Sequence, residues 1–258
     1  MAKVLAIVGS PRSGHTQALV ERIGERLTRD HGDHVELVLL RELDLEPCTG
    51  CYTCQSTSEK LCPRKDALLP LVQRMREADG VVFASPTYVG NVSALMKRLM
   101  ERMAWTAHRP QFLHKPALLV TTASSATGDT LRAMRWFRWP GFDIVAEIGW
   151  SVWPSPRVDW RPSAAREARL AKDVARFHAA MAHPRTSLSL ARVVQFYVSK
   201  STPMSDPRFF RADELYHRDI DALGFTVAPW KKRVGEAVLG VSSAWLARGL
   251  GPRARRAG

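Results

Sequence analysis

The fold is decided by residues 3–16, which read KVLAIVGSPRSGHT. Residues Lys3–Val8 are mostly apolar and favour an extended chain, so they predict a buried strand. A turn containing glycine and serine follows. From Thr16 to Asp30 the apolar residues recur at every fourth position, which predicts a helix. A strand that passes through a short loop into a helix is the first half of a βαβ unit.

The same alternation continues through the first 183 residues. Further strands are expected at residues 35–40, 81–84, 117–122 and 144–150, and helices at 66–78, 93–107, 130–139 and 162–181. Asp66 is expected to cap the helix that it begins. Helices between parallel strands cover both faces of a sheet. Five strands and no sixth favour an α/β, flavodoxin-like three-layer sandwich with a five-stranded parallel sheet in the order 2-1-3-4-5.

A change in the pattern near Pro184 predicts two domains, a flavodoxin-like domain at 1–183 and a mainly helical C-terminal extension at 184–258. The extension is basic, with thirteen Lys and Arg against six Asp and Glu, in a chain of net charge +13. Such charge favours phosphate-bearing partners such as nucleic acid, anionic lipid or a nucleotide. Because no nucleic-acid-binding motif accompanies it, nucleic acid is not an expected partner.

The composition is that of an ordinary globular protein, with 45% hydrophobic and 24% charged residues among 258. No apolar run approaches the ~20 residues that span a bilayer. The N-terminal apolar stretch is too short for a signal peptide. We therefore expect a cytoplasmic protein whose cysteines are reduced.

The loop at residues 9–16 is the first candidate site. It lies between a strand and a helix, where successive backbone N–H groups can hold a phosphate. Ser10, Ser13 and Thr16 add hydroxyl groups, and Arg12 adds a cation. The loop matches neither the Walker motif nor the dinucleotide fingerprint. The alternative is an ordinary turn whose Ser and Thr residues only cap the helix.

Two further loops follow predicted strands of the same sheet. Residues 85–93 read SPTYVGNVS, and residues 121–129 read TTASSATGD. Ligands of open α/β sheets bind beyond the carboxyl ends of the strands. Three such loops at one edge predict a mononucleotide pocket.

All four cysteines lie within fifteen residues, with the spacing C-x2-C-x2-C-x7-C. They are Cys48, Cys51, Cys54 and Cys62. The first three have a compact ferredoxin-like spacing, which favours an iron–sulfur cluster. A zinc site with four thiolates, a redox-active Cys-x-x-Cys pair and a motif without metal remain open.

The motifs Gly-Ser-Pro-Arg-x-Gly-x-Thr and Ser-Pro-x-Tyr-x-x-x-x-Ser-Ala-x-x-Lys, with Cys-x-Gly-Cys between them, resemble the NAD(P)H-dependent FMN reductase family. More narrowly, they resemble its iron–sulfur flavoprotein branch. The resemblance covers about residues 1–150 and implies that the first loop holds the FMN phosphate and that the second lies along the flavin ring. The expected FMN contacts are Ser10, Arg12, Ser13, Gly14, His15, Thr16, Pro86, Thr87, Tyr88, Val89, Gly90, Asn91 and Ser124.

The expected function is therefore that of an NAD(P)H-dependent flavin oxidoreductase. Hydride would pass from a nicotinamide to FMN, and electrons would leave to an unidentified acceptor through a [4Fe–4S] cluster on the four cysteines. The flavin carries this chemistry, so no catalytic side chain is named. The alternative is a non-enzymatic FMN electron-transfer module reduced by a ferredoxin-like partner.

The extension carries an apolar stripe formed by Val234, Val238, Val241 and Trp245. We expect it to mediate self-association, so that the protein is a homo-oligomer. A basic amphipathic helix on an anionic membrane surface is the alternative.

Overall fold

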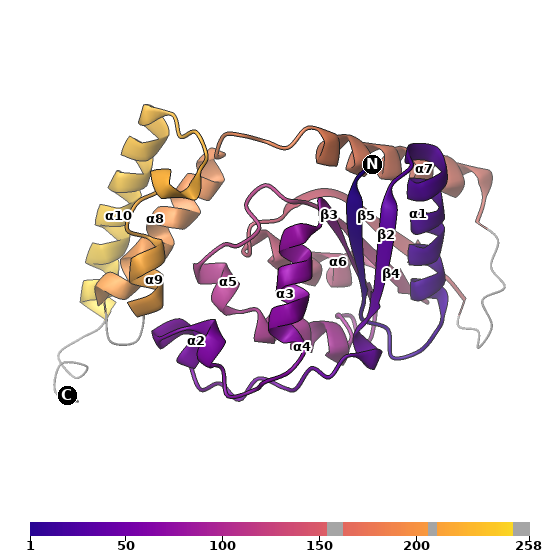
Figure 1. Ribbon diagram of the computed structural model, residues 1–258, viewed down its shortest axis with the longest axis horizontal. Helices are drawn as coiled ribbons and strands as arrows, with labels where there is room; N and C mark the ends of the chain where they lie inside the picture. The colour runs from indigo at the N-terminus through magenta and orange to yellow at the C-terminus, as the bar shows by residue number, and fades with distance from the viewer. Residues whose placement is uncertain (154–161, 206–210, 250–258) are drawn as a thin grey trace. The chain divides into compact units, whose positions relative to one another are not determined.

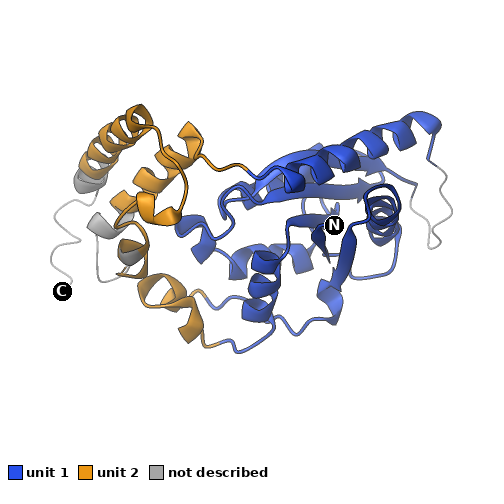
Figure 2. Cartoon of the chain, turned by 45° about the horizontal axis from the view of Figure 1, so that its top comes forward, with its two compact units in different colours: residues 1–49, 64–184 blue, residues 50–63, 185–258 orange. Residues whose placement is uncertain are grey.

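The computed structural model describes residues 1–153, 162–205 and 211–249. They form two compact units (Figure 2). The first comprises Met1–Thr49 and Arg64–Pro184, and the second comprises Gly50–Pro63 and the described part of Arg185–Gly258. A segment that contains three of the four cysteines therefore packs with the C-terminal unit, although both of its ends continue into the first.

The first unit is built on a five-stranded sheet, and every neighbouring pair of strands is parallel (Figure 1). The strands are β1 (Lys3–Val8), β2 (His34–Leu39), β3 (Gly80–Pro86), β4 (Pro116–Ala123) and β5 (Asp143–Ser151). Their order is β2-β1-β3-β4-β5. This order confirms the flavodoxin-like fold predicted from the sequence.

Helices connect these strands. The α-helices of the first unit are α1 (His15–His31), α3 (Leu68–Glu77), α4 (Ala94–Arg102), α5 (Trp105–His108), α6 (Gly128–Met134) and α7 (Ala164–Ala182). Short 3₁₀ helices, η1 (Leu40–Glu42) and η3 (Arg135–Arg138), follow β2 and α6.

One face of the sheet is covered by α1 and α7. Alternate residues of the central strands, such as Val82 of β3, point to this face, where they pack with Leu19 of α1 and Phe177 of α7. The strand residues between them point to the other side, where Phe83 stacks on Phe137 at 3.6 Å between ring centroids. The central strands are thus buried on both faces, as a parallel sheet requires.

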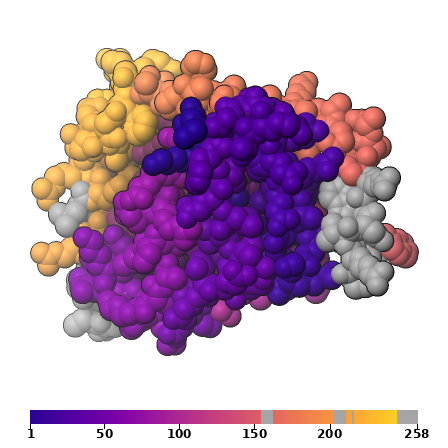
Figure 3. All heavy atoms as spheres, turned by 45° about the vertical axis from the view of Figure 1, so that its right-hand side comes forward, coloured from indigo at the N-terminus to yellow at the C-terminus, as the bar shows by residue number. Residues whose placement is uncertain are grey.

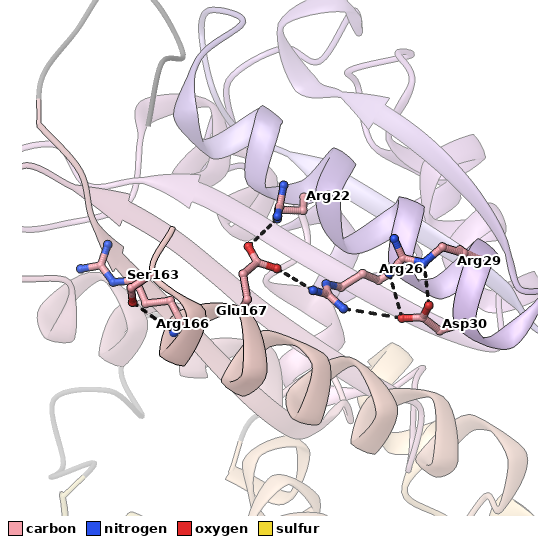
Figure 4. Close-up of polar contacts among 7 residues, drawn as sticks. All are labelled: Arg22, Arg26, Arg29, Asp30, Ser163, Arg166 and Glu167. Atoms are coloured by element: carbon pink, nitrogen blue, oxygen red, sulfur yellow. Dashed lines mark hydrogen bonds and ion pairs between the residues drawn. The ribbon is translucent and has the colours of Figure 1, made fainter. Parts of the chain in front are cut away.

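An ion-pair network joins α1 to α7 (Figure 4). The Glu167 carboxylate of α7 accepts from Arg22 at 2.7 Å and from Arg26 at 2.5 Å. Arg26 also pairs with Asp30 at 3.6 Å. Burial opposes ionisation of Glu167, but the two arginines outweigh it and hold its pKa below the usual value. The network therefore depends on a charged Glu167.

Two sequence predictions need correction. α3 begins at Leu68, and its N-cap residue is Ala67, not Asp66. The Asp66 carboxylate accepts from Leu68 N at 3.1 Å but mainly pairs with Arg102. The helix expected at 93–107 ends at Arg102, and α5 follows separately. Ser93 caps α4 as an acceptor for Met96 N.

The second unit is helical. Its α-helices are α2 (Thr53–Ser56), α8 (Leu190–Ser205), α9 (Arg211–Tyr216) and α10 (Pro229–Gly249). α8 packs against α10 and α9, and α2 packs against α9. Gly235 lies so close to Tyr197 that a Cβ there would be 2.1 Å from the ring.

Met1 is 97% exposed. Indigo atoms of the N-terminal part of the chain lie on the face of the molecule shown in Figure 3. In the described part of the chain, no helix combines the length and apolar character needed to cross a bilayer.

Candidate functional site

The loop after β1 is shaped by its own hydrogen bonds. Ser10 is buried, and its hydroxyl donates to the carbonyl oxygen of Arg12 at 2.7 Å. Because the Ser10 hydroxyl donates its hydrogen within the loop, we assign it a structural role. Arg12 and Ser13 are exposed, whereas His15 and Thr16 are buried. Arg12 and Ser13 are thus the side chains of this loop that a ligand can reach.

The N-terminus of α1 has the features of an anion site. Its N-cap is Gly14, which brings no side-chain oxygen to the first-turn N–H groups, and the first turn has no acidic residue. The positive end of the helix dipole therefore faces the loop without a carboxylate to neutralise it.

Arg41 is a further cation at this loop, and sequence reasoning missed it. It lies in η1, just after β2, and donates to the hydroxyl of Ser13 at 3.2 Å and to Gln17 at 3.0 Å. The one available signal was topological. Because β2 pairs with β1, the residues that follow β2 lie at the same sheet edge as those that follow β1.

The loop after β3 ends in a tight turn over residues 88–91. Tyr88 and Asn91 exchange backbone hydrogen bonds of 2.9 and 3.0 Å. Val89 and Gly90, between them, have φ values of 51° and 69°. Positive φ at both central residues defines a type I′ turn, in which a β-branched residue is strained. Val89 is also fully exposed, at 105%.

Hydrogen bonds lock the three loops together. Thr16, at the start of α1, bonds the hydroxyl of Thr122 at 2.7 Å, and the N–H of Thr87 donates to the carbonyl oxygen of Thr122 at 2.9 Å. The hydroxyl of Ser93 donates to the carbonyl oxygen of Gly9. The ends of β1, β3 and β4 thus form one connected edge.

The remaining predicted contacts lie on this edge. Pro86 is buried, Thr87 is half-buried, and Tyr88, Gly90, Asn91 and Ser124 are exposed. The Thr87 hydroxyl accepts a hydrogen bond from Thr130 at 2.8 Å, which ties the loop after β3 to the helix that follows β4. The donor set is backbone N–H groups, hydroxyls and two arginines around a helix N-terminus. These residues fit a mononucleotide phosphate, and Tyr88 and Val89 are exposed on the loop after β3.

The cysteine segment is compact. Gly50 and Tyr52 both have positive φ, 67° and 59°, and α2 follows at once. Cys48 belongs to the first unit, and Cys51, Cys54 and Cys62 belong to the second. All four are described, and no disulfide joins them. Four thiols are suitable donors for an iron–sulfur cluster or zinc. Across the described residues, however, no three His, Cys, Asp or Glu side chains are gathered into a metal-binding group.

The two ends of this segment are held together by a buried ion pair within the first unit. Arg102 of α4 pairs with Asp66, with only 2% and 1% of the side chains exposed, and also donates to the carbonyl oxygen of Glu46 at 2.7 Å. Burial opposes ionisation of Asp66, but hydrogen bonds from Arg102, Glu46 N and Leu68 N hold its pKa below the usual value. Arg102 therefore holds the chain just before Cys48 and the chain just after Cys62 close to each other.

The strand order defines a flavodoxin-like protein, and the edge formed by β1, β3 and β4 is its candidate site for a mononucleotide. Residues 2–148 match the sequence profile of the NADPH-dependent FMN reductase family, which is more than half of the chain. The chain belongs to this family.

Curated relatives place it near iron–sulfur flavoproteins. An iron–sulfur flavoprotein of Methanocaldococcus jannaschii is 38% identical over 100 residues, which cover 39% of this chain and 51% of that protein. One from Archaeoglobus fulgidus is 36% identical over 100 residues, which cover 39% of this chain and 48% of that protein. The match spans about half the length of these relatives.

Among solved structures, the apo form of an NADH:FMN oxidoreductase aligns with 69% of this chain and 89% of its own, at 18% identity and a TM-score of 0.49. A flavodoxin from the domain Archaea aligns with 70% of this chain and 99% of its own, at 15% identity and a TM-score of 0.45.

Proposed function

We propose that the protein is an NAD(P)H-dependent flavin oxidoreductase that binds one FMN per chain at the edge formed by β1, β3 and β4. The observation that carries this proposal is the joining of three loops at that edge, where Thr122 bonds both Thr16 and Thr87. We expect loops joined in this way to hold a phosphate at one end of the edge and a planar ring at the other with little rearrangement. Membership of the FMN reductase family supports the same ligand.

In this proposal, the flavin and the protein have different roles. FMN, when bound, supplies the redox chemistry, accepting two electrons as a hydride from the nicotinamide. The protein binds the phosphate through the N-terminus of α1 and Arg12, supported by Arg41. The turn at residues 88–91 borders the ring. The edge holds no buried carboxylate or cysteine among the predicted contacts, which suits a reaction that needs no side-chain acid or base.

The first test measures FMN binding to the apoprotein through the quenching of flavin fluorescence. Arg12→Ala should raise the dissociation constant about 10–100-fold, because a charge-assisted hydrogen bond contributes about 1.5–3 kcal/mol. Arg29→Ala is the matched control, since Arg29 is exposed at the far end of the same helix. Equal effects of the two substitutions, or recovery of stoichiometric FAD from native protein, would contradict the assignment. Bleaching of bound flavin by NADPH or NADH then tests the donor.

We further propose that Cys48, Cys51, Cys54 and Cys62 bind a [4Fe–4S] cluster. Support comes from four thiols in one short segment whose ends are fixed by Arg102, and from the names of the curated relatives. Protein purified without oxygen should contain about four irons and four sulfides per chain, and Cys51→Ala should lose them. Zinc in place of iron, or no metal after attempted reconstitution, would refute the cluster and leave the flavin proposal intact.

A further inference from the structure

The apolar stripe expected on α10 is only partly an outer face. Val234 and Val241 are exposed, but Val238 is half-buried, and the side chain of Trp245 lies outside the described residues. The described chain does not identify a partner for this stripe. The open edge of the sheet in the first unit is more specific, because its backbone and its charges both restrict what can bind there.

A groove of about 760 Å³ lies between α1 and the edge strand β2. Its apolar lining includes Val20 and Gly24 of α1 and Val35 and Leu37 of β2. α1 lies close to the strand at one end, since a Cβ on Gly24 would be 3.5 Å from the Val35 side chain. Leu37 is 37% exposed, so the groove leaves part of this apolar surface open to solvent.

The outer edge of β2 has unpaired backbone groups. Among the described strands, β2 pairs with β1 alone. The N–H of His34 donates to the carbonyl oxygen of Ala2, on the β1 side, at 2.9 Å. Because successive residues of a strand direct their backbone groups to opposite sides, Val35 and Leu37 direct theirs outward. No described residue bonds to these four groups, which makes the edge a template for another strand.

Two carboxylates border the same groove. Glu21 and Glu25 of α1 line it, and both are exposed. Glu21 accepts from Gln17 at 2.8 Å, and no described cation lies at ion-pair distance from either carboxylate. Arg29, the cation in the lining, pairs instead with Asp30 at 2.7 Å. The groove therefore offers negative charge in a chain of net charge +13.

These features fit an extended segment with basic side chains. Residues directly opposite each other in an antiparallel pair exchange both hydrogen bonds, so two residues opposite Val35 and Leu37 would satisfy all four outward groups. Their side chains would lie on the face that α1 covers, about 6.8 Å apart. Glu21 and Glu25 are one turn apart, about 6 Å along the helix axis. Lysine or arginine stems can cover Leu37 while their charged ends reach the carboxylates.

We propose that β2 is a docking edge for an extended basic segment of another protein. The segment adds to the sheet as an antiparallel strand, and two Lys or Arg side chains, two positions apart, pair with Glu21 and Glu25. Repulsion by the net positive charge of the chain disfavours binding of such a segment elsewhere. This groove lies in the first unit and does not depend on flavin or metal.

The first experiment titrates the full chain with an acetylated and amidated peptide of sequence TKTKTKT, followed by NMR. The native chain should bind it, and a TETETET peptide should not bind. Glu21→Gln and Glu25→Gln should each weaken binding about two- to fivefold, as expected for exposed ion pairs. Glu77→Gln is the control, because Glu77 of α3 also accepts from a glutamine four residues earlier, Gln73, at 2.8 Å. Equal effects of Glu21→Gln and Glu77→Gln would overturn the proposal.

The second experiment tests the strand pairing itself. The TKTKTKT peptide should slow hydrogen exchange at the amides of Val35 and Leu37. N-methylation of its lysines should abolish binding, whereas N-methylation of its threonines should not, because only the lysine N–H groups face β2. Unprotected Val35 and Leu37, or equal effects of the two methylated peptides, would overturn the edge strand. A fall in the mass of the chain by light scattering on adding the peptide would overturn it in favour of a second copy as the occupant.

Discussion

At the scale of single residues, Val89 has a backbone conformation that suits a β-branched side chain poorly. It has φ of 51° at the tip of a type I′ turn, a conformation that favours Asn or Gly and costs a β-branched residue about 1–2 kcal/mol. Its side chain is fully exposed, so packing within the described chain does not offset that cost. Strain of this kind concentrates where a ligand is bound.

Val89→Asn should therefore raise the free energy of unfolding of the apoprotein by about 1 kcal/mol, because Asn tolerates the left-handed region. Urea denaturation of the apoprotein measures the change. The same substitution at Val198 of α8, whose environment is helical, should not stabilise the chain. A loss of stability in Val89→Asn would show that the valine side chain has a structural partner.

At the scale of elements, the contact between α1 and α7 depends on Glu167. Its lowered pKa means that its contribution to stability is present above the pKa of the unfolded chain and is lost as pH falls through the folded pKa. Glu167→Gln should lower the free energy of unfolding by about 1–2 kcal/mol at pH 7. The difference from native protein should shrink below about pH 4.3. Glu25→Gln, on the exposed side of α1, should change little; a deficit that persists at low pH would contradict the ionic role.

Some elements of the fold could be predicted from the sequence, and some contacts between elements could not. The strands were predictable because their apolar runs are continuous and the loops between them contain glycine, serine and proline. The phosphate loop was predictable because strand, loop and helix are contiguous in the chain. Arg41 was not, because its bond to Ser13 spans 28 residues and no local pattern reports it. Asp66 was misassigned for the same reason: its partner Arg102 is 36 residues away.

At the scale of the whole molecule, the cysteine segment should share the stability of the second unit. Gly235→Ala would push a Cβ to 2.1 Å from Tyr197 and should loosen the packing of α8 against α10. Hydrogen exchange in residues 50–63 should then accelerate, because α2 packs on α9 and α9 packs on α8. Exchange at residues 10–16 should not change.

Gly240→Ala is the control for that experiment. Nothing lies within 4 Å of a Cβ at this exposed helical position, so the substitution should stabilise α10 by about 1 kcal/mol through its propensity. Unchanged exchange at residues 50–63 in the Gly235 variant would separate the cysteine segment from the second unit.

The grouping of Gly50–Pro63 with residues from Arg185 onward also has a consequence for synthesis. The cysteines leave the ribosome well before α9 (Arg211–Tyr216), the helix on which α2 packs. The 153 residues from Arg64 to Tyr216 take about 8–30 s to translate at 5–20 residues per second. During that interval we expect the thiols to be open to oxidants and to metal carriers. Maleimide labelling of ribosome-bound chains of increasing length would show when this exposure ends.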